Sequence, residues 1–545
     1  MRRITILAAT AVLASPLLPG PAAAQDAARL NAIEAQIRGL QAELGRVRRE
    51  MLAKDAELRT ARQEASRTRT AQASARPGAP STAPASAGGA IDSSPAQSSA
   101  PASTSAPAST STSASTSTSA STSTSAGPAD SGGVSFPQGR PTFTSDDTRF
   151  SASIGAQLHF DIGGYFQGDR NPDTRGVTRM NTFGENLRRA KLPVVFKYDD
   201  FQINITPDFG SSPDGTPTLY EANVNWTPIK GLTATVGYYK PQLTLQDSMS
   251  SNDFLLLERP SIVEIARSIA AGDSRAVAGV RYAADRYFLA GYLTGGTVGS
   301  QTAALATPQQ TGIAARVAGR PVATDDWDVH VGFSASDAFR IQRTAAGQTL
   351  TIQDRPELRI DQNRLISTGA LNARSANEYG PEFGIRYRNL LLQGEYIRVG
   401  VQRNDGGAAI RTPGLTFSGG YAEASWVITG EPRRYVASSG AFGSPKPAHP
   451  FSIKDGGAGA FELVGRFSTV DLNDRVTRGL AAAGTGGVYG GSQTVYAAGL
   501  NWYPNENLRL MLDYDFINVD RLNAAGTTQI GQRVQAVGMR AQAAF

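Results

Sequence analysis

The most regular pattern along the chain is an alternation of apolar and polar side chains that recurs throughout residues 136–545. In the stretch LRLMLDYDF, Leu508, Leu510 and Leu512 share one face, whereas Asp513 and Asp515 lie on the other. The stretches FELVGRF, YEANVNW, FQINI and FGIRYRN alternate in the same way. A period of two predicts β-strands with one apolar and one polar face. No convincing amphipathic helix interrupts this region, so we expect an all-β body.

Sixteen such strands can be placed, and turn-forming residues separate them. The predicted strands cover 151–167, 187–198, 201–209, 218–227, 232–239, 275–283, 286–295, 311–318, 327–335, 380–388, 390–400, 416–429, 459–470, 492–503, 508–519 and 532–545.

Alternation alone also fits a half-buried sheet in a soluble protein, but two further features favour a membrane barrel. Apolar faces often end near a turn in an aromatic residue, for example Trp226, Tyr387 and Trp502, as in an aromatic girdle. Connections also alternate between short and long, as periplasmic turns and outer loops do in outer-membrane barrels. We therefore predict a 16-stranded antiparallel transmembrane β-barrel.

One short-turn position breaks this alternation. Between the twelfth and thirteenth predicted strands lies GEPRRYVASSGAFGSPKPAHPFSIKDGGA, which is far too long for a simple turn. The spacing leaves two structures open, because this segment can either hang below the barrel or fold up into its lumen.

The residues before the barrel fall into three segments of different composition. Residues 1–24 have two arginines, an apolar core and a small-residue end, which predicts a cleaved signal peptide. Residues 71–135 are almost wholly Ala, Ser, Thr, Pro and Gly, which predicts a disordered linker.

The segment between them, 26–70, is predicted to be an α-helical coiled coil that lies in the periplasm. Its seam runs at heptad spacing through Leu30, Ile33, Ile37, Leu40, Leu44, Val47, Met51 and Leu58. About four heptads are enough for helices to associate as a coiled coil, so we expect self-association rather than a lone amphipathic helix. The spacing does not fix the number of helices.

Composition excludes several classes of function. The chain contains no cysteine, and its three histidines, His159, His330 and His449, lack ligand spacing, so we expect no metal site and no cofactor. Residues 136–545 hold 40 of the 53 basic and 38 of the 47 acidic residues. This near-neutral balance argues against nucleic acid as a partner. No catalytic motif is present, so we do not expect an enzyme.

Several stretches resemble the phosphate-selective porin O and P family: LRRAKLPVVFKYDD, VGYYKPQLTLQDSMSSNDFLLLERP, GGYAEASWVITGEPRRY, GAFELVGRFSTVDLND and GLNWYPNENLRLMLDYDFINVD. The resemblance implies a trimeric barrel with an anion-preferring constriction, lined by arginines and by a lysine on an inward-folded third loop. A coiled coil joined to such a barrel is similar to the dicarboxylate-type porins.

The resemblance, carried over position by position, gives a set of candidate pore-lining and anion-binding residues. They lie on the second strand, on and after the third loop, on the tenth strand and in the long turn. The set is Arg188, Arg189, Lys191, Lys240, Arg259, Arg267, Arg275, Arg281, Arg386, Arg433 and Arg434. For any single arginine the alternative is a salt bridge inside the lumen with a neighbouring strand.

The final strand, RVQAVGMRAQAAF, is expected to close the barrel, with Arg540 and Gln542 facing the lumen near the periplasmic mouth. By family resemblance, the terminal Phe545 is the signal that the barrel-insertion machinery reads. We expect a homotrimer in outer-membrane lipid that passes small anionic solutes by passive diffusion. Two alternatives stay open: a general or sugar/dicarboxylate porin without phosphate preference, and a structural envelope tether that acts through the coiled coil.

Overall fold

A computed structural model describes residues 132–167, 180–210, 217–272, 274–297, 309–344, 347–404 and 412–545. The predicted signal peptide and coiled coil, and nearly all of the predicted linker, lie outside these residues. Gly133–Ser135, at the end of the predicted linker, form the short strand β1.

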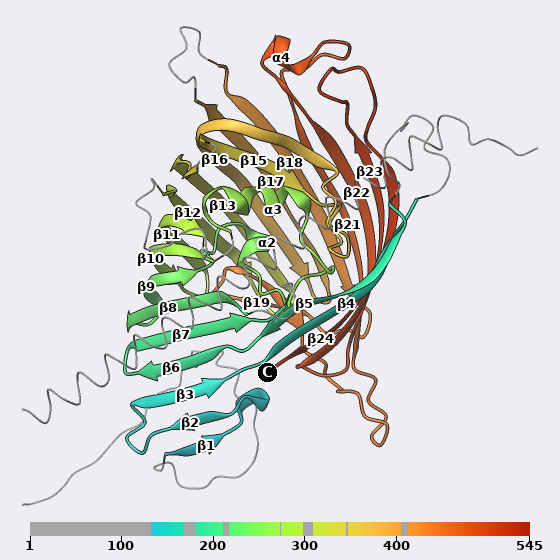
Figure 1. The fold of residues 1–545 in the computed structure, drawn as a ribbon. Coiled ribbons are helices and arrows are strands. Elements are labelled where there is room, and N and C mark those ends of the chain that lie inside the picture. Colours follow the sequence, from blue (N-terminus) through green and yellow to red (C-terminus); the bar gives the residue numbers. More distant parts are fainter. Residues whose placement is uncertain are drawn as a thin grey trace, which may run out of the picture. The chain divides into compact units, whose positions relative to one another are not determined.

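Sixteen antiparallel strands form a closed barrel, as the alternation predicted (Figure 1). Two wall strands are interrupted: β3 continues into β4 after residues 155–156, and β5 continues into β6 after Leu192 and Pro193, because proline cannot donate to the ladder. The wall consists of β3 (Phe150–Ile154), β4 (Gln157–Phe166), β5 (Thr182–Lys191), β6 (Val194–Tyr198), β7 (Phe201–Asp208), β8 (Thr218–Ile229), β9 (Leu232–Tyr239), β10 (Arg275–Ala283), β11 (Tyr287–Thr297), β12 (Thr311–Ala323), β13 (Trp327–Arg340), β16 (Ile366–Tyr387), β17 (Leu390–Arg403), β18 (Leu415–Val427), β21 (Ala460–Asp474), β22 (Val488–Tyr503), β23 (Leu508–Asp520) and β24 (Arg533–Ala544).

The barrel closes where β24 pairs with β4 in a continuous antiparallel register. Below this seam, β3 pairs with β6 on one side and with β2 (Thr142–Thr144) on the other, and β2 pairs in turn with β1. A 3-10 turn, η1 (Pro137–Gly139), joins β1 to β2. The chain thus enters the wall through a small sheet beside the barrel's own seam (Figure 1).

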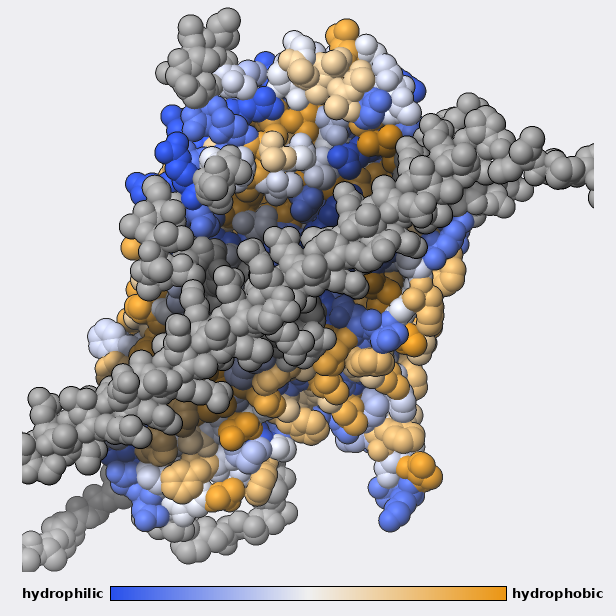
Figure 2. All heavy atoms as spheres, in the orientation of Figure 1, coloured by the Kyte–Doolittle hydropathy of each residue, from blue (hydrophilic) through white to orange (hydrophobic). Residues whose placement is uncertain are grey.

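Side-chain exposure follows the predicted alternation. In β21, Leu463 and Phe467 are each 42% exposed, whereas Glu462, which precedes Leu463 in the same strand, is fully buried. Apolar side chains therefore cover the outer face of the wall, and charged ones point inward. Figure 2 shows many hydrophobic side chains on the lower part of the visible wall and a group of hydrophilic ones along its upper left edge.

One predicted strand is much longer than expected. The alternation indicated residues 380–388, but β16 begins at Ile366 and β13 runs on to Arg340. Their extensions carry polar side chains on both faces, so they lack the apolar period that marks a wall strand. The connection between them contains β14 (Arg343–Thr344) and β15 (Gly347–Asp354), which pairs with the extension of β16.

Segments from both ends of the barrel fill part of the lumen. The third loop, residues 240–274, contains α2 (Leu245–Ser248) and α3 (Ser261–Ala270). The absence of an amphipathic helix from the barrel region was a wrong expectation, because Ile262, Ile265 and Ile269 of α3 have helical spacing and are buried. Figure 1 shows both helices inside the ring of strands. A one-turn helix, α4 (Ala482–Thr485), lies in the loop between β21 and β22.

The long turn between β18 and β21 combines the two alternatives that the sequence left open, because one part folds into the lumen and another part lies outside the barrel. Its first part forms a hairpin of β19 (Arg433–Val436) and β20 (Ala441–Pro445) inside the lumen. Arg316 of the wall donates to the carbonyls of Ser439 and Gly440 at 2.7 Å each. Its later part stays outside, where Ile453 is 89% exposed.

Within the described residues, no helix is both long enough and apolar enough to span a membrane.

Candidate functional site

A cavity of about 580 Å³ lies in the lumen between β5, the third loop and the tip of the β19–β20 hairpin. It gathers cations from segments that are far apart in the sequence. Its cationic lining residues are Arg188, Arg189, Lys191, Lys240, Arg259, Arg267 and Arg359, and its acidic ones are Asp208, Glu221, Asp253 and Glu264. Six of these seven cations belong to the set that the sequence nominated.

A β-bulge on β5 explains how two consecutive arginines reach this cavity. His159 of β4 is opposite Arg189 and Phe160 is opposite Leu187, so Arg188 is the extra residue in the ladder. In regular pleating one of two neighbouring side chains would face lipid. The extra residue shifts the alternation by one position, so both arginine side chains can face the lumen.

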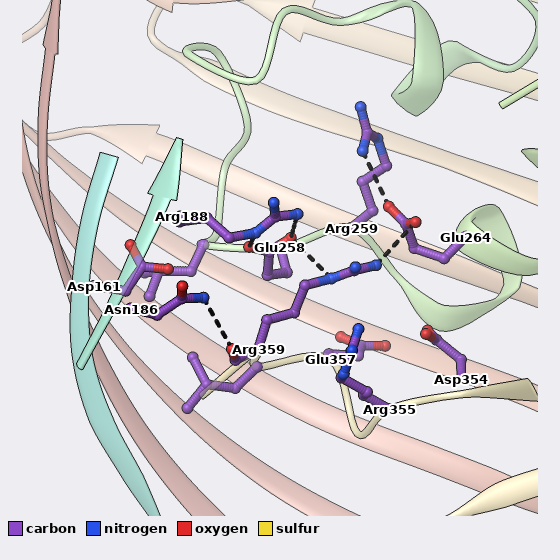
Figure 3. Close-up of polar contacts among 12 residues, drawn as sticks. Asp161, Asn186, Arg188, Glu258, Arg259, Glu264, Asp354, Arg355, Glu357 and Arg359 are labelled. Carbon is purple, nitrogen blue, oxygen red and sulfur yellow. Dashed lines mark hydrogen bonds and ion pairs between the residues drawn. The ribbon is translucent and has the colours of Figure 1, made fainter. Parts of the chain in front are cut away.

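The third loop is tied to β5 through one buried carboxylate. Arg188 donates to Glu258 through Nε at 2.7 Å and through Nη2 at 3.1 Å. Arg359, from the loop between β15 and β16, contacts Glu258 at 3.3 Å and Glu264 at 2.9 Å. Figure 3 shows Arg359 between these two carboxylates. Burial opposes ionisation of Glu258, but Arg188 and its neighbours hold its pKa well below the usual range.

A second carboxylate, Asp247 of α2, is shared by three cations. Arg267 donates to it at 2.8 Å, and Lys240 and Arg259 lie at 3.5 and 3.6 Å. Burial acts to raise the pKa of Asp247, but Lys240 and Arg267 outweigh it and lower that pKa to about 2. Burial lowers the pKa of Lys240 to about 8, partly offset by Asp247. Lys240 is therefore a cation whose charge depends on pH near neutrality.

Arg189 and Lys191 have no such partner: no carboxylate of the described residues forms an ion pair with either. Arg189 Nη1 donates to Nδ1 of His159 at 3.1 Å. Since an arginine only donates, His159 Nδ1 must accept, and its proton resides on Nε2, which faces Asn252 Oδ1 at 2.9 Å. Lys191 Nζ lies 3.0 Å from the ring centroid of Tyr220. Both side chains line the basic cavity, and no ion pair with a carboxylate of the described residues neutralises either charge.

Two smaller cavities share lining residues with the basic one and adjoin it. One of about 270 Å³ contains Arg281, which donates to Gln242 and to the Ser438 carbonyl at 3.1 Å each. The other, of about 290 Å³, contains Arg434 and reaches Arg140 and Phe545 at the end of the barrel where the chain closes. Basic side chains thus continue from the basic cavity toward this mouth.

The remaining three nominated residues lie outside all of these cavities. Arg275 is buried and donates to the Gly272 carbonyl at 2.9 Å. Arg386 pairs with Asp328 at 2.5 Å. Arg433 pairs with Glu462 at 2.6 Å, which anchors the inward hairpin. Their partners favour structural roles.

Sequence reasoning missed Arg359 and misjudged Arg540. Arg359 lies in a long loop, and its only sequence signal is the row of arginines in RPELRIDQNR. Arg540 faces inward as expected but does not line a mouth, because the third loop covers it. It pairs with Asp161 at 2.6 Å and with Glu258 at 2.9 Å. Gln542, in contrast, does line the cavity at the mouth.

The described residues contain no group of three or more histidines and carboxylates arranged to hold a metal ion.

Comparison with known proteins gives a family match over most of the chain. A family model described as phosphate-selective porin O and P matches residues 114–545. An uncharacterized protein of Caulobacter vibrioides is 30% identical over 219 residues, which cover 40% of this chain. The matched region spans only 39% of that relative's length.

Several solved structures show a weak likeness to this chain. OmpT of Vibrio cholerae, described in a trimer form, has 11% identity and a TM-score of 0.41, covering 73% of this chain and 99% of that one. The channel DcaP of Acinetobacter baumannii has 11% identity and a TM-score of 0.42, covering 74% and 99%. An anion-selective porin from Comamonas acidovorans has 11% identity and a TM-score of 0.41, covering 73% and 100%. Scores this low carry no argument about the function of this chain.

Proposed function

The chain belongs to the phosphate-selective porin O and P family, and from that premise we propose that it is an outer-membrane porin for small anionic solutes. Phosphate and carboxylates would cross by passive diffusion through the basic cavity. The observation that carries this proposal is the convergence of seven lysine and arginine side chains on one cavity of the lumen.

The residues proposed to bind the solute divide into two groups. Arg188, Arg259 and Arg267 are already held by carboxylates, so they would present fixed N–H groups and a partly neutralised field. Arg189 and Lys191 have no carboxylate partner among the described residues, and we propose that they supply most of the attraction. Guanidinium groups match the planar, two-oxygen geometry of phosphate and carboxylate.

Conduction needs binding that is strong enough to admit an ion and weak enough to release it. The cavity holds acidic groups beside its cations, such as Glu221 and Asp208. These carboxylates would keep any single position from holding an anion tightly. Arg434 and Arg281 in the adjoining cavities would offer further moderate positions. Several weak positions in series suit passage better than one tight site.

We include assembly in the proposal: the predicted coiled coil at 26–70 would join copies in the periplasm, and the working unit would be a homotrimer. The heptad seam supports this. Deleting residues 26–70 tests it by the mass of the detergent-solubilised complex. Unchanged trimers would show that the barrel alone assembles them.

Planar-bilayer recordings test the transport proposal. In a KCl gradient the zero-current potential should have the sign of chloride preference, and added phosphate should reduce chloride current. Chloride preference without any effect of phosphate or of a dicarboxylate would favour a general porin. If the purified protein forms no conducting pore but captures cell-wall material, the envelope-tether alternative is correct.

A further inference from the structure

A second feature lies on the outside of the barrel, on the face of β18 that is turned toward lipid. Four successive outward positions of this strand are small: Ser418, Gly420, Ala422 and Ala424. The next outward residue is Trp426, which is 47% exposed. A wall strand that faces hydrocarbon usually carries bulky apolar side chains at such positions, so this column forms a depression.

Aromatic side chains of the neighbouring strands border this depression. Tyr396 of β17 is in register with Gly420, and Phe467 of β21 is in register with Ala422. The rings of Phe467 and Tyr496 lie 5.3 Å apart, which supports one border. The resulting groove has a volume of about 530 Å³, and its outward-facing lining includes Tyr396, Ser418, Gly420, Ala422, Phe467 and Asp471.

The shape and chemistry of this groove fit a hydrocarbon chain rather than a solute of the pore. Its floor from Ser418 to Ala422 is about 14 Å long at 3.4 Å per residue. That length is close to half of the roughly 30 Å hydrocarbon core of a bilayer. Phosphate and carboxylates would lose hydration there without gaining a partner.

A cation lies beside one end of the groove floor, although it is not itself one of the lining residues. Arg398 of β17 is in register with Ser418, is exposed, and has no ion-pair partner among the described residues. Asp471 lies in register on the far side of Ser418, but its Oδ1 accepts from the main-chain and side-chain nitrogens of Asn473. Arg398 lies toward the end of β18 that follows the loop after β17. We expect the loops at this end of the barrel to be the outer ones, which places Arg398 in the outer leaflet.

From these contacts we infer that the groove along β18 binds one acyl chain of an outer-leaflet lipid, with Arg398 contacting the phosphate of its headgroup. Charge complementarity argues for this occupant, because an arginine on a lipid-facing strand is costly unless it meets an anion or the polar interface. The inference uses the membrane orientation of the proposed function but not its anion selectivity. A barrel with no anion preference would leave this result unchanged.

Native mass spectrometry of the full chain tests the acyl-chain part, with dimyristoyl phosphatidylglycerol as the probe. We expect wild type to retain this lipid and Ala422→Trp, which fills the groove, to lose it. Ala498→Trp is the matched control, since Ala498 is exposed on the same outer face of β22 but does not line the groove. Retention equal to wild type in Ala422→Trp would overturn the inference. Unchanged single-channel conductance verifies folding, and Ser418→Phe carries the same test if Ala422→Trp does not fold.

Replacing the cation tests the headgroup part. One arginine near an anionic lipid surface strengthens binding to that lipid roughly fivefold. We therefore expect Arg398→Gln to prefer dimyristoyl phosphatidylglycerol over the matched phosphatidylcholine roughly fivefold less than wild type does. Arg398→Lys, which keeps the charge, should restore most of that preference. If Arg398→Gln retains the wild-type preference, the assignment of the headgroup contact is wrong.

Discussion

Arg540 of the last strand and Asp161 of the first are joined by two hydrogen bonds, of 2.6 and 2.7 Å, across the seam that closes the barrel. Arg540 also contacts Glu258 of the third loop at 2.9 Å. The same side chain therefore ties the wall closure to the loop that narrows the lumen.

The first prediction follows from this contact. Arg540→Met would leave Asp161 buried without another ion-pair partner among the described residues, whereas Glu258 would keep Arg188 and Arg359. An uncompensated buried charge typically costs about 3 kcal/mol or more. Urea unfolding followed by tryptophan fluorescence should show a loss of that size in the free energy of unfolding.

A solvent-exposed ion pair provides the control. Asp326→Ala removes the partner of Arg388, and both of these side chains are more than half exposed. Exposed pairs contribute less than about 1 kcal/mol. If Arg540→Met is no more destabilising than Asp326→Ala, the seam contact does not have the role assigned to it.

The second prediction concerns pH. Because the pKa of Lys240 is lowered to about 8, the side chain is charged below that pH and neutral above it. The basic cavity thus loses one cation as pH rises, and chloride preference should fall with a midpoint near pH 8. Lys240→Arg stays charged throughout and should abolish this step. A step that persists in Lys240→Arg would mean that another group titrates.

The third prediction assigns a positioning role to His159. Its Nδ1 accepts from Arg189 and its Nε2 faces Asn252, so it links a pore cation to the third loop. His159→Leu should lower chloride preference through Arg189. A double-mutant cycle with Arg189→Gln should therefore show coupling of about 0.5 kcal/mol or more. The same cycle with Arg434→Gln, which lines another cavity, should be additive. Equal coupling in both cycles would argue for a general structural effect.

The fourth prediction concerns the inward hairpin. Replacing residues 433–445 by a short Gly–Ser turn removes β19 and β20 and the contacts of Arg316 with Ser439 and Gly440. The lumen widens, so single-channel conductance should rise. Shortening residues 449–457 of the same turn, which project outside the barrel, should leave conductance unchanged. An unchanged conductance in the first variant would place the limiting constriction elsewhere.

The sequence predicted the wall well, because lipid and lumen impose opposite chemistry on alternate residues. It predicted the outward Leu463 and Phe467 and the inward Glu462 correctly. It failed where that contrast ends, as in β16 before residue 380, where both faces carry polar side chains. It also missed α3, whose apolar residues pack inside the lumen.

The candidate site could be predicted only in part from the sequence. Basic residues of β5 and the third loop could be nominated, but their convergence depends on contacts between distant segments, such as Arg359 with Glu264. Alternation gave no reason for Arg188 and Arg189 to face the same way, because a bulge leaves no clear trace in one sequence. Local pattern likewise could not separate Arg433, which is held by Glu462, from Arg189, which is not.

The most direct test of the central claim is the zero-current potential of the reconstituted porin in a KCl gradient, compared with Arg189→Gln/Lys191→Gln. We predict chloride preference in wild type and its loss in the double variant. A control that removes two exposed turn lysines, Lys230→Gln/Lys454→Gln, should keep the wild-type value. Potassium preference in wild type, or an unchanged potential in Arg189→Gln/Lys191→Gln, would contradict the account.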